Sequence, residues 1–362
     1  MITLFGSPWG ARYDRPTMRK WFDAHLDLAY LAENGRDMRR GLADCGGPHL
    51  PAAVTFPSLA EGGVAACLGT IFTELGGHDA VAYPAGDVEA AYAAGVRQLQ
   101  WYHRWVREGV SEEWKEGTAA TRQATRGTRV GILMECADPI RLPDELSWWV
   151  ERGVIAIGLA WGRGSRYATG NMPESHSSGV GLTDTGRVLV REMDRLGVVH
   201  DLSHLSDRAC DEVLGLAIGK IMASHSNCRG LLSGAMGVGG ENHRQLRDDT
   251  IREIGKRGGV IGLNLVRNFI RSGLDKANPD DRPSVEDAVK HVEHICEVMG
   301  HRRGVGMGSD LDGGMSAREI PAGISAPRDF EKFAEALLRR GWSEEGVDAF
   351  AWGNWARFFE LN

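Results

Sequence analysis

Residues 198–225, with the sequence VVHDLSHLSDRACDEVLGLAIGKIMASH, hold the unit that decides the fold. A short apolar run opens this stretch, a segment that can hold a helix follows, and a second apolar run closes it. Eight such runs lie along the chain, at residues 21–25, 66–73, 129–135, 154–161, 198–203, 221–224, 260–265 and 304–309. Each is followed by a stretch that can hold a helix, which predicts an α/β fold, a (β/α)8 TIM barrel. A doubly wound open sheet is the alternative.

Three of the intervening segments are marked as helices by their sequence. The first spans about residues 86–108, and the second, GLTDTGRVLVREMDRLG at 181–197, places apolar residues at helical spacing. The third, SVEDAVKHVEHICEVMG at 284–300, opens with the Ser-x-x-Asp spacing of a capping box and ends on a glycine. Because no linker or repeat interrupts the pattern, we expect residues 1–362 to form a single catalytic barrel domain.

Polar side chains end five of the eight runs, and in a βα barrel the strand ends meet on one face, where active sites lie. His25 closes the first run and Asp27 follows two residues later, so on a strand both side chains point the same way. Glu135 closes the third run, and His204 and His225 follow the fifth and sixth. Each alone has a structural explanation, as a core histidine, a helix-capping aspartate or a salt-bridged glutamate. Together they favour a metal site.

The eighth run leads into GSDLDGG, which puts Asp310 at the strand end and Asp312 two residues later. A turn aspartate beside glycine is the structural alternative. Imidazole and carboxylate side chains without a thiolate suit zinc or a similar divalent ion, and a catalytic zinc takes about three protein ligands. Because five or six groups converge here, we expect two divalent metal ions that share a bridging carboxylate.

Other catalytic motifs are absent from the sequence. It contains no H-E-x-x-H, no G-x-S-x-G and no phosphate-binding loop, and the G-x-G of the eighth run lacks the third glycine of a dinucleotide fingerprint. His291 and His294 form an H-x-x-H pair in an amphipathic helical segment. We interpret this pair as part of a solvated helix face rather than as metal ligands.

The composition narrows the class of protein. Lys and Arg number 42 and Asp and Glu 49 among the 362 residues, a net charge of −7, so nothing indicates a nucleic-acid or membrane surface. The six cysteines are scattered without a C-x-x-C pair, which favours free thiols in a reducing compartment. The sequence shows no signal peptide and no apolar run of about 18 residues, so we expect a cytoplasmic protein.

The motifs DAHLDL, DLSH, SHSN and GSDLDG, with the glutamate of the third run, resemble in order and spacing the membrane (renal) dipeptidase family, peptidase family M19 of the amidohydrolase superfamily. The resemblance covers nearly the whole chain, as far as GNWARFFE near its end. It implies a TIM-barrel hydrolase with two zinc ions. It also implies a homodimer, since barrels of this superfamily often dimerise.

The resemblance assigns the metal ligands residue by residue. His25 and Asp27 would bind the more buried ion, Glu135 would bridge both ions, and His204 and His225 would bind the second ion. All five positions match the family pattern.

The resemblance also assigns groups that act on the substrate. Asp310 would be the catalytic acid and base beside the metal-bound water. The stretch ENHRQLRDD resembles the family's R-N-x-x-D-[DE] pattern, so Arg244 would bind the substrate carboxylate through a bidentate contact. Trp161 stands where family peptidases often carry a substrate-binding histidine, and Phe72 stands where a substrate-side tyrosine is found.

The implied activity is hydrolysis of dipeptides, including those with a C-terminal D-residue, by a water that bridges two zinc ions. Because Trp161 replaces a hydrogen-bond donor, a binuclear hydrolase of another small amide, an N-acyl amino acid or a lactone is the alternative. A non-catalytic barrel protein would have no need of the intact ligand set. A deaminase of the superfamily is disfavoured, because its first-strand motif is H-x-H and this chain has an aspartate at Asp27.

Overall fold

The computed structural model describes residues 18–114, 127–232, 242–275 and 277–361. Eight parallel strands follow one another around a ring in the order β10, β11, β1, β2, β6, β7, β8, β9. Their bounds are β1 Trp21–Leu26, β2 Val64–Ile71, β6 Arg129–Met134, β7 Val154–Gly158, β8 Val199–Asp201, β9 Ile221–Met222, β10 Ile261–Leu263 and β11 Val305–Met307. Each overlaps one of the eight predicted runs, with ends that differ by a few residues.

The ring closes between β9 and β10. Ala223, which follows β9, accepts a hydrogen bond from the Gly262 backbone N–H at 2.8 Å and donates one to the Val260 carbonyl at 3.1 Å. Because both ends of the strand order are joined, the sheet is a barrel and not the open doubly wound sheet that we kept as the alternative. The (β/α)8 prediction is confirmed.

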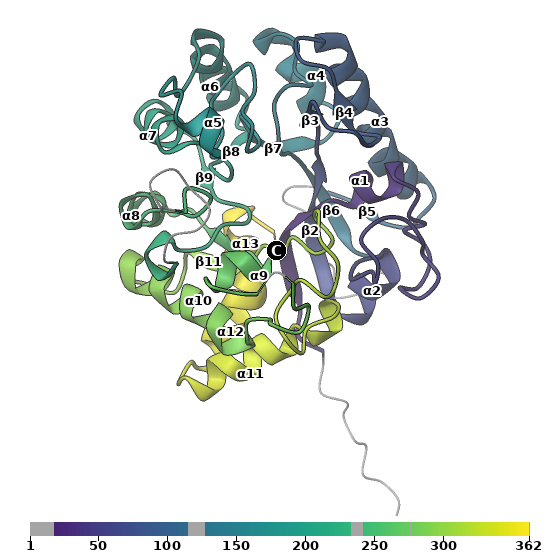
Figure 1. Ribbon diagram of the computed structural model, residues 1–362, viewed down its shortest axis with the longest axis vertical. Coiled ribbons are helices and arrows are strands. Elements are labelled where there is room, and N and C mark those ends of the chain that lie inside the picture. Colours follow the sequence, from purple (N-terminus) through teal and green to yellow (C-terminus); the bar gives the residue numbers. More distant parts are fainter. Residues whose placement is uncertain (1–17, 115–126, 233–241, 276, 362) are drawn as a thin grey trace, which may run out of the picture.

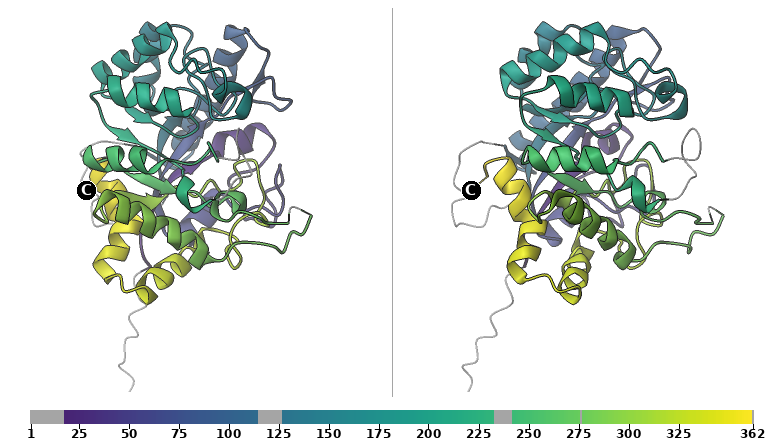
Figure 2. Two further views of the ribbon diagram at one scale, coloured as in Figure 1. Left: turned by 60° about the vertical axis from the view of Figure 1, so that its left-hand side comes forward. Right: turned by 90° about the vertical axis from the view of Figure 1, so that its left-hand side faces the viewer.

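Helices surround the strands on the outside, as the three views agree (Figures 1 and 2). Their bounds are α1 Leu28–Glu33, α2 Phe56–Glu61, α3 Val88–Arg107, α4 Leu146–Val150, α5 Pro173–His176, α6 Asp184–Leu196, α7 Asp207–Leu216, α8 Asp248–Lys256, α9 Arg267–Ile270, α10 Val285–Met299, α11 Glu331–Arg339, α12 Glu344–Asp348 and α13 Asn354–Phe358. Short strands are β3 Glu74–Leu75 and β4 Ala82–Tyr83, which pair together, and β5 Glu112–Glu113, which pairs with β6.

The helices with the clearest sequence signals form where we expected them. Helices α3, α6 and α10 fall inside the three predicted segments. Helix α10 begins with the capping box, in which Ser284 and Asp287 satisfy each other's backbone N–H groups, and ends at Gly300 in the left-handed conformation, φ +74°. These local signals coincide with the bounds of the helix.

Aromatic side chains close the barrel at the amino ends of its strands. Phe22 of β1 stacks on Trp355 of α13 and on Phe359, each at 5.7 Å between ring centroids. Leu68 and Leu133 from β2 and β6 join the same buried cluster. Apolar side chains thus fill the interior of the barrel below the carboxyl ends of the strands. Among the described residues, no helix has the length and apolar character that crossing a bilayer requires.

Candidate active site

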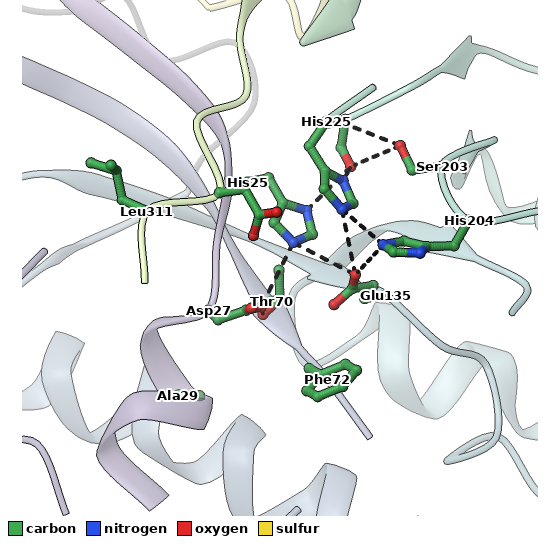
Figure 3. A network of polar contacts seen from close by, with 12 residues as sticks. His25, Asp27, Ala29, Thr70, Phe72, Glu135, Ser203, His204, His225 and Leu311 are labelled. Carbon is green, nitrogen blue, oxygen red and sulfur yellow. Dashed lines mark hydrogen bonds and ion pairs between the residues drawn. The ribbon is translucent and has the colours of Figure 1, made fainter. Parts of the chain in front are cut away.

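Glu135 lies at the centre of a buried polar cluster at the carboxyl ends of the strands (Figure 3). It directly follows β6, and its Oε1 lies 3.7 Å from Nε2 of His25 near the end of β1. Asp27 is the residue between β1 and α1, and its Oδ1 lies 3.7 Å from the same histidine nitrogen. The side chains expected to hold one metal ion therefore lie together.

Two further imidazoles approach Glu135 from the neighbouring strand ends. Its Oε1 lies 3.1 Å from Nε2 of His204, which follows β8, and 3.6 Å from Nε2 of His225, which follows β9. The two histidine Nε2 atoms are 3.0 Å apart. Glu135 Oε1 thus lies near all three histidines, and the His25 and His225 rings stack at 3.5 Å between centroids, so the carboxylate can contribute to a metal site with each of them.

Asp310 completes the cluster from the end of β11. Its backbone N–H donates to the His25 carbonyl at 3.1 Å, and its carboxylate belongs to a group with His25 and Asp27 whose ligand atoms lie within 4.8 Å of one another. The backbone is left-handed at Asp310, φ +60°, and at His204, φ +66°. Non-glycine residues adopt this conformation uncommonly, and such strain concentrates at functional sites.

Gly313 leaves space beside the two aspartates. A Cβ atom at this position would lie 1.9 Å from Asp310 Oδ1 and 3.0 Å from Asp27 Oδ2. A side chain would therefore collide with the carboxylates, so the local sequence keeps this part of the cluster open.

Ser224 fixes the tautomer of two of the histidines. Its Oγ lies 2.6 Å from Oδ2 of Asp201, 3.2 Å from Nδ1 of His25 and 2.8 Å from Nδ1 of His225. A carboxylate accepts only, so the serine hydroxyl donates to Asp201 and accepts from both Nδ1–H groups. Both Nε2 atoms then keep their lone pairs, as metal ligands must.

Burial keeps the three imidazoles neutral. Desolvation lowers the pKa of His25, His204 and His225 well below the usual value, and neighbouring positive groups, including Arg244, lower the pKa further. Nε2 of His25 is buried and has no hydrogen-bond partner among the residues that the structure describes. A buried nitrogen with a free lone pair is costly unless a ligand occupies it.

The pKa values of the carboxylates are shifted in the opposite direction, upward. Burial raises the pKa of Asp27 to about 6, although Thr70 donates a hydrogen bond to it. Burial, with the charge of neighbouring carboxylates, raises the pKa of Glu135 and Asp310 well above the usual range. A divalent ion would stabilise this cluster, because its charge offsets the repulsion between the buried carboxylates and the neutral imidazoles can bind it. These residues therefore fit a metal centre.

Arg244 supplies a positive charge at the rim of this cluster. Its Nη2 donates to the His225 carbonyl at 2.9 Å and its Nη1 to Ser226 Oγ at 3.2 Å, while the guanidinium lies over the Phe269 ring at 5.2 Å. Its buried Nε has no hydrogen-bond partner among the described residues. The guanidinium is held rigidly and retains a donor for a ligand.

Trp161, three residues beyond β7, also lies at the site. Its ring centroid is 5.8 Å from that of His204 and 5.4 Å from that of Phe72. Of the neighbouring arginines, Arg166 is bound to Asp138, and the exposed Arg163 faces Glu74 at 3.6 Å.

Asp312, the second aspartate of GSDLDGG, has a structural role. It is fully buried, pairs with Arg36, and accepts hydrogen bonds from the backbone N–H groups of Ala53 and Val54 at 2.8 and 2.9 Å. It therefore ties the loop before α2 to the end of β11.

The interpretation of the H-x-x-H pair as a solvated face is wrong for His291. Its Nδ1 accepts from the Cys228 backbone N–H at 3.1 Å and its Nε2 donates to the Ile270 carbonyl at 3.0 Å, and only 1% of the residue is exposed. His294 is partly buried, with Nε2 2.8 Å from Asp248. A buried histidine with both nitrogens bonded stabilises the fold and is not available to a metal.

Two residues of the cluster were missed by the sequence analysis. Ser224 ends the sixth run and Asn264 lies near the end of the seventh, so position at a strand end was the available signal. Asn264 is fully buried and donates from Nδ2 to Asp310 Oδ2 at 3.0 Å. Serine and asparagine are too common in proteins for their residue type alone to indicate a site.

A second group of ligand-type side chains, His176, Asp207 and His243, lies beside the Arg244 loop. The two imidazole rings stack at 3.8 Å, and Arg229 binds both oxygens of the Asp207 carboxylate at 2.6 and 2.8 Å. Because that guanidinium already pairs with both oxygens of the carboxylate, the contacts of this group connect neighbouring loops.

Comparisons with known proteins agree with this geometry. The model of a family described as membrane dipeptidase (peptidase family M19) matches residues 17–361. An uncharacterized protein in the pqqA 5' region of Klebsiella pneumoniae is 29% identical over 216 residues, 59% of this chain and 74% of that protein. An uncharacterized dipeptidase of Schizosaccharomyces pombe is 32% identical over 171 residues, 47% of this chain and 35% of that protein.

A crystal structure of a metallo peptidase from Rhodobacter sphaeroides, liganded with a phosphinate mimic of the dipeptide L-Ala-D-Ala, is similar over 95% of this chain and 99% of that chain. Its TM-score is 0.75 and its sequence is 25% identical.

Proposed function

This chain belongs to the membrane dipeptidase family, peptidase family M19, and we propose that it hydrolyses the peptide bond of dipeptides with the help of two zinc ions. The observation that carries the proposal is the buried cluster of imidazoles and carboxylates around Glu135, with Arg244 at its rim. We also propose that residues 1–362 form one catalytic domain, and that the protein works in the cytoplasm, because its six cysteines form no disulfide.

We take the ligand assignment from the family pattern, and the distances around Glu135 are compatible with it. His25 and Asp27 would hold one ion, His204 and His225 the other, and Glu135 would contribute to both. Ions bound there would polarise the scissile carbonyl and lower the pKa of a water molecule toward neutrality.

Asp310 is the residue that would transfer protons. It would accept the proton of the attacking water and return it to the leaving amine, so one carboxylate would serve both halves of the reaction. Asn264 donates to Oδ2 of this carboxylate. Oδ1 is therefore the oxygen on which the proton would be carried.

Arg244 would bind the C-terminal carboxylate of the substrate. Ser226 and the His225 carbonyl hold two of its nitrogens, so the guanidinium is oriented before the substrate arrives. A fixed carboxylate site one residue from the scissile bond selects dipeptides over longer peptides. We include substrates with a C-terminal D-residue, supported by the dipeptide mimic bound to the Rhodobacter sphaeroides metallo peptidase.

Trp161 motivates a second candidate function. An indole ring beside His204 offers no hydrogen bond to a peptide carbonyl from its face. The same centre would then act on another small amide, an N-acyl amino acid or a lactone, and a substrate panel with zinc-reconstituted protein separates these classes.

The carboxylate contact gives the test of the proposed function. We expect zinc-reconstituted protein to cleave Ala-Ala but to cleave Ala-Ala amide with a kcat/KM lower by about 10- to 100-fold, because the amide cannot pair with a guanidinium. Arg244→Met should make the kcat/KM values of the two substrates nearly equal, mainly by raising KM for Ala-Ala. Equal cleavage of both substrates by the unaltered protein would contradict the proposal.

A further inference from the structure

Three aromatic rings form a continuous row beside the metal-ligand cluster. Tyr30 of α1 meets Phe72 edge to face at 5.8 Å between centroids, and Phe72 meets Trp161 edge to face at 5.4 Å. The row ends against His204, 5.8 Å from Trp161. Phe72 and Trp161 are partly exposed, and Figure 3 shows the Phe72 ring facing the Glu135 carboxylate.

The row is held in place by polar contacts behind it. The buried amide of Gln98 on α3 binds both backbone groups of Phe72: it accepts from the N–H at 3.0 Å and donates to the carbonyl at 2.5 Å. The Tyr30 hydroxyl lies 3.1 Å from Nε2 of His49. These contacts orient the rings without a ligand, so little ordering is needed on binding.

The strand order places Phe72, the central ring of this row, across the barrel mouth from Arg244. Phe72 follows β2, whereas Arg244 lies in the segment after β9. Around the ring, β6, β7 and β8 separate these two strands on one side, and β10, β11 and β1 separate them on the other. A substrate whose carboxylate contacts Arg244 and whose scissile carbonyl lies over Glu135 must therefore extend its acyl side toward Phe72.

We propose that Tyr30, Phe72 and Trp161 form the acyl-side specificity wall, and that the protein prefers dipeptides whose N-terminal side chain is aromatic or large and apolar. The inference rests on the proposed function, since it takes the direction of the substrate from the carboxylate contact with Arg244. Aromatic faces and edges offer apolar area and edge-to-face ring contacts, but the negative ring faces do not favour an anionic side chain such as that of aspartate. Phe72 and Trp161 would be the specificity-determining residues.

The first test compares two series of substrates. We expect kcat/KM for Phe-Ala and Leu-Ala to exceed that for Gly-Ala and Asp-Ala by about tenfold or more, the range that apolar pockets achieve. The reversed series, Ala-Phe against Ala-Gly, should differ less. If the kcat/KM values across the first series lie within about twofold of one another, the proposed specificity is wrong.

Variants locate the preference. Phe72→Leu keeps an apolar side chain but removes the ring, and Trp161→Leu does the same at the second position; each should reduce the Phe-Ala to Gly-Ala ratio several-fold. Tyr92→Leu is the matched control, because the Tyr92 ring packs on Trp148 and Trp149 away from the site. A ratio unchanged in both wall variants would overturn the proposal.

A binding measurement separates this inference from the proposed function. Calorimetry on zinc-loaded Asp310→Asn protein should give a Kd for Phe-Ala about tenfold lower than for Gly-Ala. That result without any turnover by the unaltered protein would support the wall and contradict the dipeptidase. Turnover of both dipeptides with equal affinities would support the dipeptidase and overturn the specificity proposal. Failure of both dipeptides to bind would also overturn the specificity proposal, without supporting the dipeptidase.

Discussion

The side-chain amide of Asn264 donates a hydrogen bond to Asp310, with Nδ2 3.0 Å from Oδ2. The side-chain amide of Asn264 cannot flip to exchange its oxygen and nitrogen, because its Oδ1 accepts a hydrogen bond from the Val266 backbone N–H at 2.7 Å. Asn227 fixes the Asn264 backbone by bonding its N–H at 3.0 Å and its carbonyl at 2.9 Å. Asn264 is thus a positioning residue for the carboxylate that we assign as the proton carrier.

Replacement of Asn264 should affect turnover more than binding. Asn264→Ala should lower kcat by about 10-fold or more with a small change in KM, since a general base that loses its orientation loses part of a contribution of about 10² to 10⁴. The acid limb of the kcat profile should move to higher pH, because the hydrogen bond lowers the pKa of Asp310. Asn278→Ala, in an exposed loop, is the control. An unchanged kcat and pH profile would rule out the positioning role.

Ser224 is expected to control metal affinity. Ser224→Ala removes the acceptor for Nδ1–H of both His25 and His225, so their tautomers are no longer fixed. Loss of such a partner costs about 10- to 100-fold in metal affinity, measurable by competition with a chromogenic zinc chelator. Ser226→Ala, which removes a contact to Arg244, should leave zinc affinity unchanged and raise KM. Equal zinc affinity in the two variants would contradict the tautomer argument.

Substitution of the two aspartates of GSDLDGG should have different effects on stability. Asp312→Asn leaves the buried guanidinium of Arg36 without its counter-charge, and breaking a buried ion pair costs about 3 to 5 kcal/mol. Urea unfolding should show this loss, whereas Asp310→Asn should unfold at nearly the same urea concentration as the unaltered protein. Equal stability of the two variants would show that Asp312 does not anchor the loop.

Acid should destabilise the fold through His291. Burial lowers its pKa from 6.5 to about 4, so the unfolded chain binds a proton that the folded chain excludes between these values. Stability from this group is therefore complete above about pH 6.5 and is lost as the pH falls toward 4, by about 3 kcal/mol in total. His291→Gln can keep both hydrogen bonds without titrating, so its unfolding free energy should fall less over this range. Parallel curves for the two proteins would contradict the assignment.

The architecture followed from the sequence because barrel strands are buried on both sides. Each strand is a short apolar run, even β9, which has only the two residues Ile221–Met222. The register that closes the ring between Ala223 and Ile261 has no local signal, because it depends on the curvature of the whole sheet.

The local sequence indicated the metal-ligand cluster, but it did not indicate the residues that support this cluster. His, Asp and Glu at strand ends are conspicuous among apolar residues, whereas Ser224 and Asn264 are ordinary until their neighbours are known. His291 shows the reverse error, since its helical segment looks amphipathic while the residue is buried. Its partners Cys228 and Ile270 lie 63 and 21 residues away, beyond the reach of a local pattern.

The most direct measurement of the central claim is the turnover of zinc-reconstituted protein and its Asp310→Asn variant on L,L- and L,D-dipeptides, with metal content and unfolding measured on the same samples. The account predicts cleavage by the unaltered protein and a loss of about 10²-fold or more in kcat in the variant, with equal zinc content and equal stability. Cleavage at the same rate by both proteins would contradict it, because Asp310 would then carry no proton in the reaction.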